Sequence, residues 1–264
     1  MNSSLFQALA AALAATKIEQ KLASTATLAD NWNAGLLNID IPHSPQLACG
    51  RPEKPELVAP GAVQQRNPKT PEGRARLLHA IVHIEFSAIN LALDHVARFP
   101  GMPRQYYADW IGVAVEEAYH FTLLRERLQA LGHDYGDFPA HAGLWDMAEK
   151  TSGDVLTRMA LVPRLLEARG LDATPPIRSK LSQAGDEESA RILDIILHDE
   201  IGHVGLGDAW FRRLCSERDL EPEATYRGLL KEFDAPWPQA PFNEAARLAA
   251  GFTAAELAAL VAAR

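Results

Sequence analysis

The chain has few cysteines, no long uninterrupted apolar run and no segment with the alternating pattern of a β-strand. Its two cysteines, Cys49 and Cys215, lie far apart and form no Cys-x-x-Cys motif, which excludes a disulfide framework and a zinc knuckle. Such cysteine usage is typical of the reducing cytoplasm, so we expect a cytoplasmic protein. The apolar runs are too short for a transmembrane helix, and the N-terminus lacks the pattern of a signal peptide.

Basic charge and several catalytic motifs are also missing. The chain carries 26 Lys and Arg residues against 34 Asp and Glu residues, a formal net charge of -8, which argues against a broad nucleic-acid surface. It has no glycine-rich phosphate loop, no Gly-x-Ser-x-Gly turn and no His-Glu-x-x-His motif. These absences argue against nucleotide-binding folds, serine hydrolases of the α/β type and zinc metalloproteases.

Helical patterning covers most of the chain, so the predicted fold class is all-α. Four long helical segments of similar length, joined by short and medium connections, favour an antiparallel four-helix bundle. The region between residues 38 and 70 is too rich in proline to be a helix or a central strand, and we expect an extended arm that packs on the core. We predict one domain over residues 1–264, built from N-terminal helices (1–37), the arm (38–70), the core bundle (71–218, with helices at about 71–99, 103–131, 144–169 and 186–218) and a C-terminal extension of short helices (222–264).

Acidic side chains interrupt the apolar stripes of these helices. Glu85 follows His-Ala-Ile-Val-His-Ile, and its neighbours on the same helix face are apolar. A bare carboxylate in such a position costs several kcal/mol, so it must be paired, protonated or bound to a metal. The other three segments each carry a comparable set. They contribute Glu117 with His120, then Glu167, then Glu200 with His203.

The order and spacing of these residues are more specific than any one motif. A single Glu-x-x-His match arises easily by chance. Here, however, Glu117 follows Glu85 by 32 residues and Glu200 follows Glu167 by 33. That length, with a turn in the middle, returns an antiparallel helix to the same height. The chain therefore holds two helix pairs, each with one lone Glu and one Glu-x-x-His, and we expect all six side chains to meet inside the bundle.

This set of four carboxylates and two histidines resembles the ferritin-like di-iron carboxylate superfamily. The segments Arg51–Val58, Gly73–Glu85 and Asp199–Val204 further resemble a bacterial ferritin-like family of unknown function. That family is similar in site pattern to the MiaE family of tRNA hydroxylases. The resemblance implies a centre of two Fe ions, with Fe/Mn or Mn as alternatives, and the metal ligands Glu85, Glu117, His120, Glu167, Glu200 and His203.

Several neighbouring residues have two interpretations. Glu116 and Asp199 precede ligand glutamates and can accept the second ring N–H of a ligand histidine, or they form ordinary solvated ion pairs. Tyr119 is a weak catalytic candidate, because an aromatic side chain at the helix boundary with its hydroxyl in water is the simpler interpretation. Gly202 can leave room beside the metals or allow close helix packing, and packing is slightly favoured. Pro163 is expected to bend the third helix.

Three functional classes remain open. The first is an oxygen-activating oxidase or hydroxylase that uses dioxygen, an unknown substrate (a modified tRNA nucleoside or a small metabolite) and an electron-donor protein. The second is a ferroxidase or other metal-handling protein with the same ligands. The third is a metal-free helical scaffold in which the buried Glu and His residues form a polar core. The arm and the C-terminal extension fit a cage-forming shell poorly, which favours the enzyme.

Overall fold

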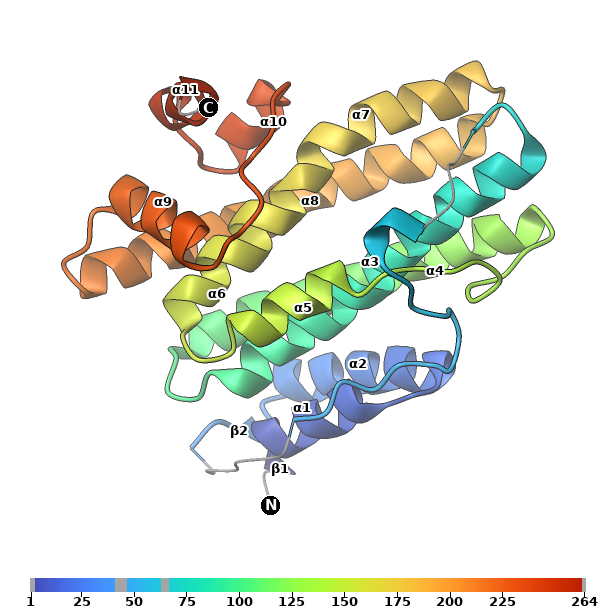
Figure 1. The fold of residues 1–264 in the computed structure, drawn as a ribbon. Coiled ribbons are helices and arrows are strands. Elements are labelled where there is room, and N and C mark those ends of the chain that lie inside the picture. Colours follow the sequence, from blue (N-terminus) through green and yellow to red (C-terminus); the bar gives the residue numbers. More distant parts are fainter. Residues whose placement is uncertain (1–2, 41–46, 63–66, 263–264) are drawn as a thin grey trace. The chain divides into compact units, whose positions relative to one another are not determined.

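The computed structural model describes residues 3–40, 47–62 and 67–262, and these residues are mostly helical (Figure 1). Within them, the β-structure amounts to one parallel pair of two-residue strands, β1 (Ser3–Ser4) and β2 (Leu37–Asn38), and one isolated bridge between Leu57 and Ala140. The all-α prediction is therefore confirmed. Neither cysteine forms a disulfide, as the sequence indicates.

The chain divides into two compact units, residues 1–145 and 146–264, here named the N-terminal unit and the C-terminal unit. Helix α5 (Gly143–Lys150) spans the division. Each unit contains one long helix pair of the kind that the sequence predicts. The single domain over 1–264 and the four-helix bundle stay predictions.

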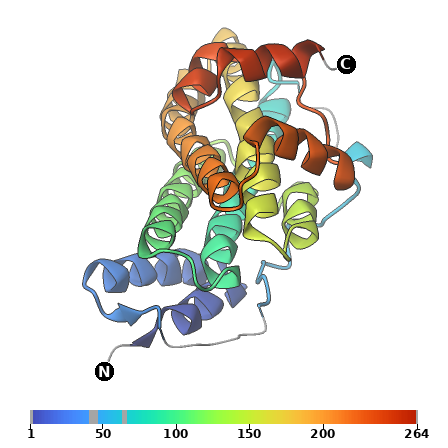
Figure 2. The same ribbon diagram turned by 90° about the vertical axis from the view of Figure 1, so that its left-hand side faces the viewer.

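In the N-terminal unit, two short helices pack on two long ones. Helix α1 (Leu5–Ala14) contacts α3 (Pro71–Arg98), and α2 (Ile18–Asn33) contacts α4 (Arg104–Ala130), as both ribbon views show (Figures 1 and 2). Helix α3 is long and apolar enough to cross a membrane, but 72% of its most apolar window is buried inside the protein. Such burial is typical of the core helix of a soluble protein, so packing accounts for its composition.

Helices α3 and α4 form an antiparallel hairpin with well-defined ends. Thr70 accepts a hydrogen bond from the Gly73 amide, and Pro71 occupies the first turn, where its missing N–H costs nothing. Ring contacts fix the register of the pair: Phe86 packs on Phe121, and His95 packs on Trp110. Residue numbers thus rise along α3 while their partners fall along α4. The predicted boundaries of both helices are confirmed to within a residue or two.

The described part of the proline-rich arm is extended, as predicted, and lies against the N-terminal unit. The amide of Gly50 donates to the Leu13 carbonyl at 2.8 Å, and the amide of Val58 donates to the Ala140 carbonyl at 2.8 Å. Its only helical turn in the described range is the 3-10 turn η1 (Pro60–Ala62). Pro42 and Pro45, which belong to the predicted arm, lie outside the described residues.

The C-terminal unit is built on a second antiparallel pair. The first member of the pair comprises α6 (Val155–Leu161), the π-helix η2 (Val162–Glu167) and α7 (Ala168–Gln183). The second member is α8 (Glu187–Glu217). Two ion pairs set the register, since Arg178 contacts Asp194 and Arg164 contacts Asp208. The 14 residues from Arg164 to Arg178 therefore lie opposite the 14 residues from Asp208 back to Asp194, as expected for antiparallel helices.

The third predicted helix, residues 144–169, begins where expected, at α5, but its continuity and its end are wrong. It breaks before Asp154, which caps α6 by accepting a hydrogen bond from the Thr157 amide and also binds Arg218. Its predicted end at residue 169 is also wrong, because α7 continues to Gln183.

A long-range contact compensates for Pro175, one of the two prolines inside α7. A proline removes the hydrogen bond to the carbonyl four residues earlier, so Pro175 leaves the carbonyl of Leu171 without its helical donor. The side-chain amide of Asn243 donates to that carbonyl at 3.1 Å. A residue 72 positions away in sequence thus compensates for the proline, and no local pattern reveals it.

The C-terminal extension consists of α9 (Pro222–Glu232), α10 (Glu244–Ala249) and α11 (Ala254–Ala262), in agreement with the predicted short helices. Apolar residues of α7 and α8, among them Leu171 and Val204, form one core cluster with Ala246, Phe252 and Leu257 of the extension. The extension is therefore part of the core of its own unit rather than a loose tail.

One buried lysine ties the helices of the N-terminal unit together. Lys21 on α2 is fully buried, and its ammonium donates to the Leu13 carbonyl at the end of α1 and to the Asn90 side chain on α3. Burial lowers the pKa of Lys21 to about 8, below its usual value of 10.5, although Cys49 opposes this shift. The folded protein therefore holds this proton less tightly than the unfolded chain does.

Replacing Lys21 with Met should remove a distinct pH dependence of stability. Between pH 8 and 10.5 the unfolded chain binds the Lys21 proton and the folded protein releases it, so this group makes the free energy of unfolding rise with pH. We expect the difference between wild type and Lys21→Met to shift by about 3 kcal/mol in favour of wild type across this range. Urea unfolding at several pH values measures it, and a difference that does not change with pH would contradict the prediction.

Candidate metal centre

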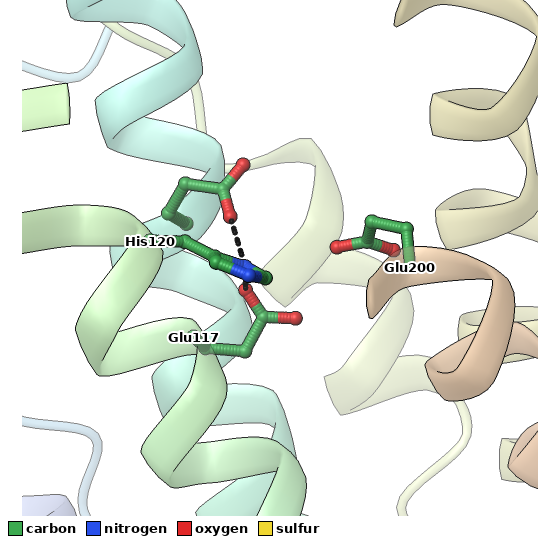
Figure 3. A group of neighbouring side chains, drawn as sticks. Glu117, His120 and Glu200 are labelled. Carbon is green, nitrogen blue, oxygen red and sulfur yellow. Dashed lines mark ion pairs between the residues drawn. The ribbon is translucent and has the colours of Figure 1, made fainter. Parts of the chain in front are cut away.

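Three of the predicted ligands form a cluster inside the N-terminal unit. Glu85 on α3 and Glu117 and His120 on α4 are all buried, with exposed fractions of 3%, 1% and 0%. The Nδ1 atom of His120 lies 3.4 Å from a carboxylate oxygen of Glu85 and 3.6 Å from one of Glu117. Figure 3 shows the carboxylate of Glu117 and the ring of His120 turned toward each other. The structure thus brings these three side chains together, and the meeting of all six stays a prediction.

The helical register accounts for this convergence. Glu117 and His120 are three residues apart, so they share one face of α4. Phe86 and Phe121, which follow Glu85 and His120 in sequence, pack ring to ring at 5.5 Å and hold the two helices level at this height. The 32-residue spacing read from the sequence thus brings Glu85 opposite the Glu-x-x-His pair.

The separations in the cluster fit a shared ion. Two atoms bound at about 2.1 Å to one first-row metal ion lie about 3.0 to 4.2 Å apart, depending on the angle between the bonds. The two measured separations from His120 fall inside this range, and the ligand atoms of Glu85, Glu117 and His120 all lie within 4.8 Å of one another. Carboxylate oxygen with imidazole nitrogen is a donor set that suits iron, manganese or zinc.

The charge of the cluster also favours a cation. Burial alone would lower the pKa of His120, but the carboxylates of Glu117 and Glu85 outweigh burial and raise it to about 11. The metal-free protein therefore holds an imidazolium between two carboxylates. With both carboxylates ionised, the cluster holds one more negative charge than a single imidazolium can balance. A bound metal ion would compensate this charge and displace the proton from His120.

The C-terminal unit carries the matching residues. On α8, the Nδ1 atom of the buried His203 lies 3.7 Å from a carboxylate oxygen of Glu200, and Glu200 is half-buried. Glu167 is also half-buried and is the last residue of the π-helix η2. Because Arg164 pairs with Asp208 in the antiparallel register, Glu167 lies about level with the turn of α8 that carries His203. This unit therefore repeats the set of two glutamates and one histidine.

The other predicted residues differ in their outcome. Tyr119 is 51% exposed on α4, which agrees with a boundary aromatic. His83, which the sequence places on the opposite face from the ligands, contacts the Tyr135 hydroxyl at 2.9 Å and the His141 carbonyl at 3.0 Å. Glu116 is exposed and Asp199 is half-buried, and their supporting role stays a prediction.

The two glycines and the proline near the C-terminal set have distinct environments. Pro163 lies at the start of the π-helix, so the disturbance expected there takes this form. A Cβ atom added to Gly207 would lie 2.5 Å from the Cβ of Pro163, whereas one added to Gly202 would meet no described atom within 4 Å. Close packing thus explains Gly207, and the close packing slightly favoured for Gly202 is wrong.

A cluster of buried charges near Glu167 has no clear signal in the sequence. Arg164 is 1% exposed and binds Asp208 of α8 and Glu256 of α11. Arg247 of α10 is 2% exposed and binds Asp172. Arg164 and Asp172 lie three and five residues from Glu167 in sequence, and their charges alone do not distinguish a role at the site from one at a helix end. Their partners, 44 to 92 residues away, come only from the tertiary structure.

The residues described so far define a helical protein with a buried cluster of acidic and histidine side chains that can hold a metal ion. The chain belongs to a family described as "Protein of unknown function (DUF455)", whose pattern matches residues 14–258. It is similar to an "Uncharacterized protein" of Haemophilus influenzae, with 50% identity over 213 residues, covering 78% of this chain and 74% of the relative. No solved structure shows a significant match.

The contrast between Gly207 and Gly202 can be tested with a matched pair of variants on α8. Gly207→Ala would press on Pro163, and such overpacking costs about 1–3 kcal/mol, so we expect a lower free energy of unfolding. Gly202→Ala has room for the methyl group and should raise it by about 0.5–1 kcal/mol, since Ala favours helix. Chemical denaturation compares the two, and equal effects would show that Pro163 does not press on α8.

Proposed function

We propose that this chain is a dinuclear metal protein with the ferritin-like four-helix arrangement. The buried cluster of Glu85, Glu117 and His120 carries the proposal, because its geometry and its donor atoms fit a metal ion. The set of Glu167, Glu200 and His203 in the C-terminal unit supports it, because it repeats the same residue types at nearly the same spacing. In the proposal, each unit contributes one half of the ligands.

The donor set guides the choice of metal. Two carboxylates and one imidazole per ion, without thiolates, suit iron or manganese. We propose two Fe ions, with Fe/Mn and two Mn as alternatives. Such a pair can supply electrons and charge stabilisation for the reduction of dioxygen. The protein's part is to hold the carboxylates ionised, the histidines neutral and the surroundings apolar, and Phe86 and Phe121 supply apolar surroundings beside Glu85 and His120.

We propose an oxygen-activating oxidase or hydroxylase rather than an iron store. The extended arm packs along the N-terminal unit, and the C-terminal extension packs on α7 and α8 of its own unit. Both additions cover helix faces that a cage-forming shell would use for assembly. A modified tRNA nucleoside and a small metabolite are the proposed substrate classes, with an electron-donor protein as partner. Tyr119 receives no catalytic role, because half of its surface is exposed.

Metal analysis of protein purified from cells tests the dinuclear centre. We expect about two metal ions per chain in wild type, and none or one in Glu85→Ala, because this variant removes a buried carboxylate ligand. Glu126→Ala is the matched control, since Glu126 lies on the same hairpin but is exposed, and it should keep two ions. Circular dichroism checks that each variant is folded. Metal-free wild type that also fails to bind added iron or manganese would favour the polar-core scaffold instead.

Loading with excess ferrous iron under air separates the enzyme from an iron store. A centre with six fixed ligands should oxidise and hold about two iron ions per chain and then stop. A store would accumulate many ions per chain as mineral. Iron retained after gel filtration, measured against protein, gives the ratio, and values far above two in wild type would show that metal handling is the function.

A further inference from the structure

The backbone changes its helical form directly before Glu167. Residues Val162–Glu167 form a π-helix between α6 and α7, and Glu167 is its last residue. A π-helix places more residues in each turn than an α-helix, so it turns the side chains that follow to a different direction. Such segments are rare, commonly single turns, and occur often at functional sites. The orientation of Glu167 therefore depends on what keeps this turn in its π form.

Pro163 explains why the α-helix is interrupted, because it has no N–H to donate. It also packs tightly, since a Cβ on Gly207 of α8 would lie 2.5 Å from its own Cβ. Pro163 is four residues before Glu167, and Gly207 is four residues after His203. This contact holds one side of the π-turn against α8. Proline has no polar side-chain atom, however, so it makes no hydrogen bond that could orient the rest of the turn.

Arg164 holds the other side of the π-turn. It lies three residues before Glu167 and is 1% exposed. Its Nε donates to Asp208 of α8 at 2.6 Å, and its Nη2 donates to Glu256 of α11 at 2.7 Å. The guanidinium also lies 4.2 Å from the ring centre of Tyr226 and 4.7 Å from that of Phe252. The π-turn is thus attached to two other helices through one planar side chain.

The partners of Arg164 are themselves fixed. Arg212 donates from Nε to Asp208 at 2.6 Å and from Nη2 to Glu256 at 2.7 Å, so two carboxylates and two guanidinium groups form a balanced set. Glu256 accepts a hydrogen bond from the Thr253 amide, and the Thr253 hydroxyl accepts one from the Glu256 amide. This reciprocal pair is a capping box at the start of α11. The arginine therefore meets acceptors with little freedom to move.

We propose that Arg164 is a positioning residue for Glu167: through Asp208 and Glu256 it keeps η2 in its π form and so directs the Glu167 carboxylate toward the metal centre. The inference rests on the proposed function, in which Glu167 is a metal ligand. It gives the C-terminal extension a part in metal binding, because Glu256 belongs to α11. A role in stability alone explains less, since a buried ion pair adds little net stability compared with apolar side chains of similar volume.

A double-mutant cycle on metal affinity tests the inference in the full chain. We expect Arg164→Met to weaken binding of one of two Mn²⁺ or Co²⁺ ions at least tenfold, about as much as Glu167→Gln does. The double variant should bind no more weakly than Glu167→Gln alone, because Arg164 acts through Glu167. The visible spectrum of the Co²⁺ protein should change in the same way in both single variants.

Arg164→Met is a stringent test of the inference, because it also removes a positive charge. Removal of a nearby positive charge would by itself strengthen cation binding, so a loss of affinity requires a change in geometry. Asp208 and Glu256 keep Arg212 as a partner in this variant, so neither carboxylate is left without a cation. Arg178→Met is the matched control, since Arg178 makes an exposed ion pair between the same two helices and should leave affinity unchanged.

The outcomes separate the inference from the function on which it rests. Wild-type affinity in Arg164→Met, or losses that add in the double variant, would overturn the role of Arg164 while Glu167 remains a ligand. Unchanged metal binding in Glu167→Gln would overturn the ligand itself and the inference with it. If Arg164→Met does not fold, Glu256→Gln replaces it in the cycle under the same criterion, a loss of affinity that does not add to that of Glu167→Gln.

Discussion

The burial of carboxylates between apolar helices is the constraint on which the rest of this structure depends. Glu85 and Glu117 are removed from water on α3 and α4, where an ionised side chain costs several kcal/mol unless a cation or a donor meets it. His120 supplies part of the compensation. With both carboxylates ionised, the cluster holds one more negative charge than a single imidazolium can balance. A positive ion bound there would compensate it.

The C-terminal unit also buries charged side chains, but it balances them in a different way. Its helix pair also carries two glutamates and a histidine, but it adds buried arginines that bind Asp172, Asp208 and Glu256. These ion pairs join α7, α8 and the C-terminal extension. Since buried ion pairs contribute little net stability, their effect is best understood as geometry, because a guanidinium held by two carboxylates allows only one arrangement of the helices around it.

The sequence predicted the features that local chemistry controls. The predicted helix starts at residues 71 and 186 agree with α3 and α8 to within a residue, and the spacing between Glu85 and Glu117 gives the register of the first hairpin. The helix predicted at 144–169 failed where distant residues decide the outcome. Asn243 satisfies the carbonyl that Pro175 leaves without its donor, and Asp208 and Glu256 hold Arg164 beside a π-turn. Periodicity within a segment carries no information about such partners.

The Thr151–Asp154 break is a different kind of error, because its signal is local. Asp154 precedes Thr157 by three residues and accepts its amide hydrogen bond, which is an ordinary N-cap. The expectation of four helices of equal length obscured this cap. The error leaves the predicted ligand set unchanged, because that prediction depends on register near the middle of each pair rather than on where the helices end.

The repeated set has a thermodynamic consequence for the proposed dinuclear centre. Ligands that converge only in the folded protein bind the ion only when the protein is folded, so binding would stabilise the fold, by an amount that grows with the logarithm of metal concentration over the dissociation constant. Carboxylates that lie close together repel one another when they are ionised and no metal is bound. Metal would then raise the free energy of unfolding, because it compensates the residues that cost most to bury.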